Sequence, residues 1–243
     1  MVPAAVRTVR AAEGEDRMNR PLAKVLLYTA VTALTGAALV GCLAEDHRRD
    51  VGYRVTEQVR TLVIEGETGD VEVTGGATGI EVTEQQTYRE SAPEASHTVA
   101  DGTLTLSYRC PDGDCGVGYK VRVPAGIVVK VHDSTGSIRL TGLSGEVEAR
   151  TGTGGITAAL SSPVVRLAAE TGDVSASVDG DVRRVEAVSS TGDVRVRVPR
   201  DRPYAVDSAT DTGAVKVSVD RSAGAGCSIT ARTETGDVTV DGV

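Results

Sequence analysis

Residues 190–199 read Ser-Thr-Gly-Asp-Val-Arg-Val-Arg-Val-Pro, and this short stretch decides the fold. A Thr-Gly turn is followed at once by a run in which Val alternates with Arg. Alternation with a period of two places the apolar side chains on one face of a β-strand and the charged side chains on the other. The stretch therefore predicts a tight turn that leads into a strand buried on one face only.

The same turn recurs along the chain at nearly regular intervals. Measured between turn glycines from Gly136 onward, the intervals are 18, 18, 20, 21 and 23 residues. A unit of about 20 residues cannot bury its apolar face alone, whereas stacked units share one continuous core. The glycines expected at these structural turns are Gly69, Gly136, Gly154, Gly172, Gly192, Gly213 and Gly236.

The residues on either side of each turn repeat as well, so that each repeat reads as strand, turn, strand. We therefore predict an all-β chain that forms a right-handed parallel β-solenoid of about six to seven coils. An antiparallel sandwich or barrel would also use short strands and turns, but it would not need the same residue type at the same phase of every turn. Six positions before the turn threonine, the aliphatic residues are Val129, Val147, Val165, Val185, Val206 and Ile229.

The composition agrees with a fold built from strands and turns. Hydrophobic residues make up 40% of the 243 residues, but aromatic residues only 2%, and the chain has no Phe and no Trp. The core must therefore be built from Val, Ala, Leu and Ile, and Val favours strands. The 28 Gly supply the tight turns.

The first 41 residues have the features of an export signal. A basic stretch precedes an uncharged apolar run over residues 25–41, which ends in Leu-Val-Gly directly before Cys42. So short a run, with small residues at its end, suits a cleaved signal peptide better than a spanning helix. Leu-Val-Gly-Cys resembles a lipobox, and the resemblance places a diacylglycerol lipid on Cys42. Met18 would begin a more ordinary signal peptide, which would make residues 1–17 a start-site artefact.

Behind the signal we expect a linker, a cap and a regular repeat region. The linker spans residues 42–54, the first coil and the N-terminal cap span residues 55–123, and the regular repeats span residues 124–243. Within the cap, residues 85–97 are polar and contain a proline, so we predict a loop there.

Two cysteines flank a turn within the cap, in Cys110-Pro-Asp-Gly-Asp-Cys115. Thiols of exported proteins are commonly oxidised and Asp-Gly marks a tight turn, so we expect a β-hairpin stapled by a disulfide. A metal site is the alternative, but two thiolates without another Cys or a His nearby make only half of a zinc site. Cys227 is left over, and it shares the parity of Ile229, so we expect it to point into the core.

Several runs resemble the bacterial family of domains of unknown function called "putative adhesin". They are Thr-Gly-Asp-Val-Arg-Val-Arg-Val-Pro199, Tyr119-Lys-Val-Arg-Val-Pro-Ala-Gly126 and Asp101-Gly-Thr-Leu-Thr-Leu106. The resemblance covers residues 55–243 and rests on the texture of the repeats. It implies a β-solenoid at the cell surface, behind a lipobox or a membrane segment. It brings no catalytic residues and no established activity.

Two sets of turn residues, threonines and aspartates, recur from repeat to repeat and are candidates for ligand binding. Threonines precede the turn glycines, as in the faces of ice-binding solenoids, but they share the parity of core residues and are expected to face inward. The aspartates could form a calcium ladder. The column is interrupted in the other repeats, however, and Asp beside Gly is ordinary turn chemistry, so we expect no metal. The aspartates that follow a turn glycine are Asp70, Asp173, Asp193 and Asp237.

The charges narrow the choice of partners. The formal net charge is −8, which disfavours nucleic acid. Arg195 and Arg197, with Lys216 one repeat further on, belong to the one basic concentration of the exported part. They could contact an anionic envelope polymer, or they could pair with neighbouring acids and form a solvated face.

The sequence offers no basis for catalysis. It contains no Gly-X-Ser-X-Gly, His-Glu-X-X-His or phosphate-binding Gly-Lys-Thr motif. A polysaccharide-acting enzyme would need clustered carboxylates in a cleft, and sugar binders commonly stack their ligands on aromatic residues. We therefore expect no catalytic residue and no cofactor.

Together these features predict a non-enzymatic lipoprotein on the outer face of the cytoplasmic membrane or at the cell surface, where it presents a structural or adhesive module. The alternative is an accessory module that binds an anionic cell-wall polymer or an envelope protein. Because the last repeat carries no covering segment, we also expect weak end-to-end self-association through residues 233–240.

Overall fold

The computed structural model describes residues 46–243, and these residues form two β-sheets without a helix. No helix in this range is long and apolar enough to span a membrane. We call the ten-stranded sheet sheet A and the nine-stranded sheet sheet B. The prediction of an all-β chain is confirmed. The export signal and Cys42 lie outside the described residues.

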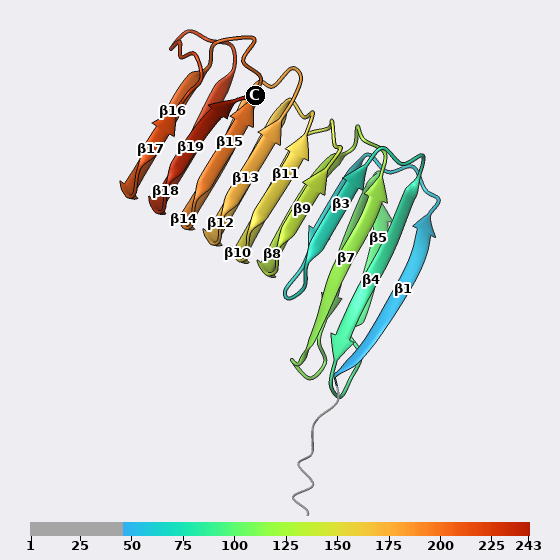
Figure 1. The fold of residues 1–243 in the computed structure, drawn as a ribbon. Helices are drawn as coiled ribbons and strands as arrows, with labels where there is room; N and C mark the ends of the chain where they lie inside the picture. Colours follow the sequence, from blue (N-terminus) through green and yellow to red (C-terminus); the bar gives the residue numbers. More distant parts are fainter. Residues whose placement is uncertain (1–45) are drawn as a thin grey trace, which may run out of the picture. The chain divides into compact units, whose positions relative to one another are not determined.

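The two sheets face one another and contain their strands in matching order (Figure 1). In spatial order, the strands of sheet B are β16 (Ala205–Thr212), β18 (Ser228–Thr235), β14 (Arg184–Thr191), β12 (Val164–Thr171), β10 (Val147–Thr153), β8 (Val128–Thr135), β2 (Thr61–Glu65), β6 (Thr103–Arg109) and β5 (Glu94–Ala100). Those of sheet A are β17 (Val215–Val217), β19 (Val238–Gly242), β15 (Val194–Val198), β13 (Val174–Val178), β11 (Ile156–Leu160), β9 (Ile138–Thr141), β3 (Val71–Gly75), β7 (Cys115–Val123), β4 (Ile80–Tyr88) and β1 (His47–Val55).

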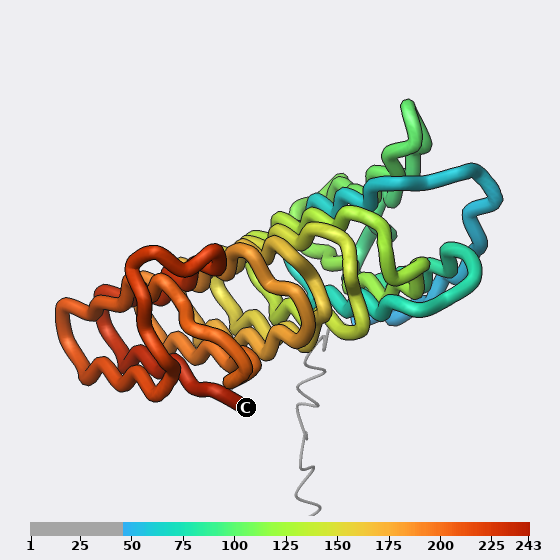
Figure 2. The backbone as a smooth tube through the Cα atoms, turned by 90° about the horizontal axis from the view of Figure 1, so that it is seen from above, coloured from blue at the N-terminus to red at the C-terminus, as the bar shows by residue number. Residues whose placement is uncertain are grey.

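A strand of sheet B and the strand of sheet A that follows it in the chain make one layer, for example β14 and β15. Figure 2 shows the chain passing from one sheet to the other within each layer. Neighbouring layers pair in parallel and in register, so that Val185 lies between Val165 and Ile229. This register explains why the same residue types recur at the same phase of each repeat.

The order of the layers departs from the order of the chain at both ends. The last layer of the chain, β18–β19, lies between β14–β15 and β16–β17. At the other end β2–β3 lies between β6–β7 and β8–β9. The outermost C-terminal strands are therefore β16 and β17. The expectation that residues 233–240 form the free edge is wrong. Residues 218–227 lead from β17 to β18, and β18 and β19 then pair between the two preceding layers.

Both sheets are mixed. The N-terminal strands β1, β4 and β7 pair antiparallel in sheet A, and β5 pairs antiparallel with β6 in sheet B. Two sequence predictions fail here. β1 occupies most of the predicted linker, and β4 and β5 occupy most of residues 85–97, where a loop was expected. A parallel stack thus describes the repeats but not this end of the molecule.

The predicted hairpin around the two cysteines is also wrong. β6 belongs to sheet B and β7 to sheet A, so the turn between them crosses from one sheet to the other. Cys110 and Cys115 are joined by a disulfide at this crossing, with 5.5 Å between their Cα atoms. The true hairpin is β5–β6, whose turn contains Asp101 and Gly102, both with positive φ. Positive φ at two central residues is typical of a two-residue hairpin turn.

The core lies between the sheets and consists mainly of Val, Leu, Ile and Ala. Its two ends differ. At the N-terminal end Tyr53 of β1 stacks on His97 of β5, with ring centroids 4.4 Å apart, and so joins the edge strands of the two sheets. At the C-terminal end no strand of residues 46–243 covers β16 and β17, and Val215 remains 45% exposed.

Candidate functional site

The Thr-Gly turns form one column along an edge of the stack, and glycine is needed there for two reasons. Gly154 has φ +139°, a conformation that residues with a side chain rarely adopt. A Cβ added to it would lie 2.1 Å from the carbonyl oxygen of Gly136 in the next layer. The glycines in this column therefore permit close stacking of the layers.

The aspartate after the turn glycine links one layer to the next. The carboxylate of Asp173 accepts a hydrogen bond from the backbone N–H of Asp193 at 2.8 Å, and Asp193 accepts in the same way from Asp237. Asp237 in turn accepts from Ala214 at 2.8 Å. These carboxylates are thus used between layers. In residues 46–243, no group of three His, Cys, Asp or Glu side chains is arranged to hold a metal ion.

A second column lies inside the turn. Its hydroxyl groups donate to the carbonyl oxygen of a turn glycine in the neighbouring layer, over distances of 2.8 to 3.1 Å. The threonines directly before the glycines are exposed, so the prediction that they face the core is wrong. They lie where the chain bends out of the strand, and strand parity no longer applies there. The inner hydroxyl donors are Thr151, Ser189, Thr210 and Thr233.

Asp133 of β8 occupies this inner column in place of a hydroxyl residue. It is buried, and its Oδ2 atom has no hydrogen-bond partner. Burial, and next the nearby charge of Asp70, raise the pKa of Asp133 to about 6. A protonated carboxyl could donate a hydrogen bond as the hydroxyl groups do, whereas a carboxylate cannot.

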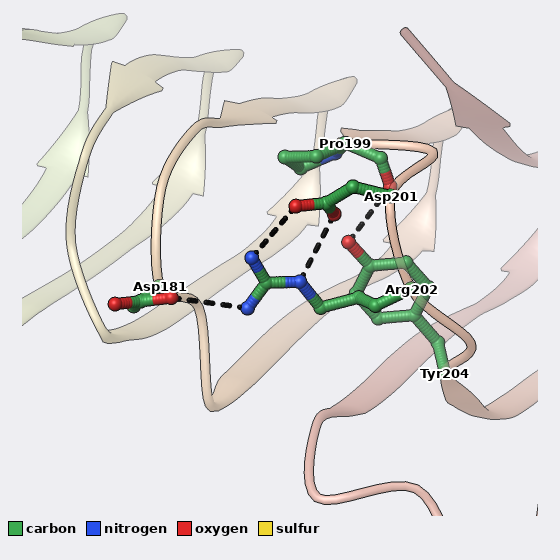
Figure 3. A network of polar contacts seen from close by, with 5 residues as sticks. All are labelled: Asp181, Pro199, Asp201, Arg202 and Tyr204. Carbon is green, nitrogen blue, oxygen red and sulfur yellow. Dashed lines mark hydrogen bonds and ion pairs between the residues drawn. The ribbon is translucent and has the colours of Figure 1, made fainter.

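The opposite corner is tied together by Arg202 (Figure 3). Its guanidinium donates to both carboxylate oxygens of Asp201, at 3.0 and 2.9 Å, and to Asp181 at 3.1 Å. The buried Tyr204 donates its hydroxyl hydrogen to the carbonyl of Pro199 at 2.8 Å. This part of the basic concentration is therefore paired within the protein and serves to hold the turn between β15 and β16.

A buried polar cluster at the N-terminal end includes Tyr53, which also stacks on His97. Glu84 of β4 accepts hydrogen bonds from Tyr53 at 2.8 Å and from Gln86 at 3.0 Å, and Gln86 accepts from Arg49 at 2.6 Å. Burial, with the charge of Glu84 as a smaller cause, raises the pKa of Tyr119. Sequence reasoning missed this cluster, because inward-facing polar residues interrupt the apolar alternation of β4.

The outward face of sheet A from β9 to β17 carries four cations. Arg195 and Arg197 lie on β15, Arg139 lies on β9, and Lys216 lies on β17; all four are exposed. None of them takes part in an ion pair among the described residues. Lys216 lies two strands from Arg195, not one, because β19 lies between them. We call the outward face of these strands the cationic face.

The outward face of sheet B differs. Acids lie among its cations: Arg150 pairs with Glu148 at 3.0 Å, Arg232 pairs with Asp207 at 2.6 Å, and Arg166 lies in register between Glu148 and Glu186. A groove of about 1220 Å³ runs between these two pairs, over the small side chain of Ala168. Because Glu170, Asp211 and Glu234 also line it, this groove attracts an anionic partner less than the cationic face does.

No protein-family model and no curated protein matches the chain. Solved structures of low sequence identity are similar over most of its length. A "putative cell adhesion protein" from Clostridium sporogenes is 12% identical, with a TM-score of 0.49, over 81% of this chain and 100% of that one. A "putative adhesin" from Bacteroides fragilis is 15% identical, with a TM-score of 0.43, over 82% and 97%.

A third similar structure bears a different name. It is a "putative lipid binding protein" from Parabacteroides distasonis, 12% identical with a TM-score of 0.33, over 83% of this chain and 98% of that one. At such identities and TM-scores the likeness carries no argument, and the site must be argued from this chain's own residues.

Proposed function

We propose that this protein is a non-enzymatic, lipid-anchored envelope protein that displays a β-solenoid as an adhesin-like module at the cell surface. In this proposal each layer is one coil of the solenoid, and the lipid is carried by Cys42. β1 begins at His47, so a lipid on Cys42 would hold that end of the module within about 18 Å of the membrane.

The proposal rests on a difference between two groups of polar side chains, those that bind other parts of the chain and those that remain exposed. The turn carboxylates, the inner hydroxyls and Arg202 bind other parts of the same chain. The cations of the cationic face are exposed and take part in no ion pair among the described residues. Such a surface suits contact with another molecule, and it lacks the paired carboxylates of a glycosidase site.

A second candidate function is an accessory module that binds an anionic cell-wall polymer or an envelope partner protein. The cationic face favours it, because four basic side chains gather there on a protein whose net charge is −8. The two candidates differ in what the surface contacts, another cell or the protein's own envelope.

Fractionation of cells tests the proposal. Wild-type protein should stay with the membrane and incorporate labelled fatty acid, whereas the Cys42→Ser variant should remain an uncleaved precursor without label. Retention of purified protein on intact cells, compared with retention on the isolated envelope of the producing bacterium, separates the two candidates. Protein that is unlabelled and binds neither material would contradict both.

A further inference from the structure

We infer that the cationic face is a binding site for a linear polyanion, a polymer of the phosphodiester type, which lies across the strands and parallel to the stacking direction of the layers. This inference deepens the proposed function and rests on it. It names the ligand class, the residues that bind it and the direction in which the ligand runs.

Charge selects an anion. Arg195 and Arg197 are two residues apart on the same face of β15, a distance of about 7 Å. Lys216 lies two strand spacings away, about 10 Å. These three cations are therefore about 7 to 12 Å apart, which is about one to one and a half Debye lengths at physiological salt, so one charged chain can contact them together. The one acid among the outward residues of β15, β19 and β17 is Asp241, which lies in register beside Arg197 and accepts a hydrogen bond from Ser218 at 2.8 Å, so the three cations outnumber the acid.

Shape selects an extended chain. Arg139 on β9 is five strand spacings from Lys216, about 24 Å along the stack. A single small anion could reach only one or two of these cations, whereas a polymer can contact all four. Arginine suits the contact because its guanidinium binds a phosphate through two hydrogen bonds.

The residues between the cations favour a ligand that is bound through its charged backbone over one that is bound through its sugar rings. The outward residues of the intervening strands are small, and several carry hydroxyl groups that can donate to phosphate oxygens. No outward position from β9 to β17 carries an aromatic ring on which a sugar could stack. The hydroxyl residues nearest the cations are Thr157, Ser175, Ser177 and Thr239.

Acidic residues on both sides set the direction of the ligand. Asp173, Asp193 and Asp237 lie at the corner where the strands of sheet A begin, and Asp179 lies directly after the end of β13. A polyanion aligned with a strand would meet these acids, whereas one that runs from layer to layer stays between them. Repulsion at the corners therefore confines the chain to the strip that contains the cations.

The experiment compares two matched triple variants of the full-length protein in neutral detergent. The first is Arg195→Gln, Arg197→Gln and Lys216→Gln. The control is Lys130→Gln, Arg166→Gln and Arg184→Gln on the outward face of sheet B, which changes the net charge by the same amount. The probe is end-labelled linear polyphosphate, followed by fluorescence polarisation at several salt concentrations.

We expect the first triple variant to lose at least tenfold in affinity and most of the salt dependence, while the control changes less than twofold. Inorganic phosphate should compete poorly on a molar basis. Equal losses in the two variants, or no binding by the wild type, would overturn the inference. So would equally effective competition by vesicles of anionic phospholipid, which would identify a membrane surface as the partner.

An envelope-binding assay separates failure of the inference from failure of the proposed function. If the first triple variant is retained on cells and envelope as well as the wild type, the display function stands and the polyanion site is refuted. If neither wild type nor variant is retained on any surface, the proposed function itself fails, whatever the binding of polyphosphate.

Discussion

At the scale of single residues, the repeat is maintained by backbone contacts between layers. The turn glycine permits the layers to approach, the aspartate after it accepts an N–H from the next layer, and the inner hydroxyl binds a glycine carbonyl. Each interaction contributes about 1 kcal/mol, or somewhat more where an ionised carboxylate accepts the hydrogen bond. Residues that break the pattern are therefore the informative ones.

Replacement of a turn glycine should be severely destabilising. In Gly154→Ala the new Cβ would lie 2.1 Å from a backbone oxygen at a φ of +139°, so two layers must separate. We expect a loss of about 3 kcal/mol or more in the free energy of unfolding, measured by chemical denaturation. Gly224→Ala is the matched control, because its Cβ would meet nothing within 4 Å. Comparable losses in the two variants would show that close stacking is not the reason for the glycine.

Asp133 should make the stability of the protein depend on pH. Its pKa is raised in the folded state to about 6, so between about pH 4 and pH 6 the folded protein holds a proton that the unfolded chain has released. Stability from this group is therefore fully present below about pH 4 and is lost as the pH rises through about 6. Unfolding by urea at a series of pH values measures this dependence.

Asp133→Thr should remove this part of the pH dependence. The new hydroxyl can donate to the carbonyl of Gly69, as the inner hydroxyls do in other layers. At pH 7 we expect a gain of about 1–3 kcal/mol, because a buried carboxylate oxygen without a partner is removed. The gain should shrink below pH 4, where the carboxyl is protonated. A gain that is constant with pH would exclude titration of Asp133 as the cause.

At the scale of strands, the sequence predicts the regular repeats well and both ends poorly. Strands β8 to β15 follow from alternation, because most of their inward residues are apolar. β4 escapes the same reasoning because Glu84 and Gln86 face inward and satisfy one another. The order of the layers could not be predicted from alternation either. All repeats share one register, so the order of the chain and the observed order align the same residue types. One sequence feature agrees with the observed order. Ala214 stands where several other turns have an aspartate, and it lies in the outermost layer, where a carboxylate would have no next layer to bind.

The layer order predicts the relative cost of two inward-facing charges. Ala231 of β18 is fully buried between β14 and β16, whereas Ser208 of β16 is half-buried at the open end. Ala231→Asp should cost about 4 kcal/mol, because it buries an unpaired charge, and Ser208→Asp about 1 kcal/mol. Thermal and chemical unfolding measure both. The opposite ranking would mean that the layers follow the order of the chain.

At the scale of the molecule, the stack is asymmetric in two directions. Its two outward faces differ, because several acids lie among the cations of sheet B, whereas the four cations of the cationic face have one acid, Asp241, among them. Its two ends differ as well, because antiparallel strands and the Tyr53–His97 pair close one end while β16 and β17 leave the other open. Contacts with a second copy should therefore involve the open end.

The open end should associate weakly with a second copy of the chain. Within the described part of the chain the outer edges of β16 and β17 are unpaired, and inward-facing Val215 is 45% exposed beside them, so pairing would bury apolar surface and satisfy backbone groups. Asp207 and Lys216 place charges on these strands, which keeps the contact weak. A fragment that begins at residue 46 should show concentration-dependent sedimentation that Val215→Lys abolishes and that Ala159→Lys, on the exposed face of β11, leaves unchanged. A monomer at all concentrations, or equal effects of the two lysines, would contradict association through this end.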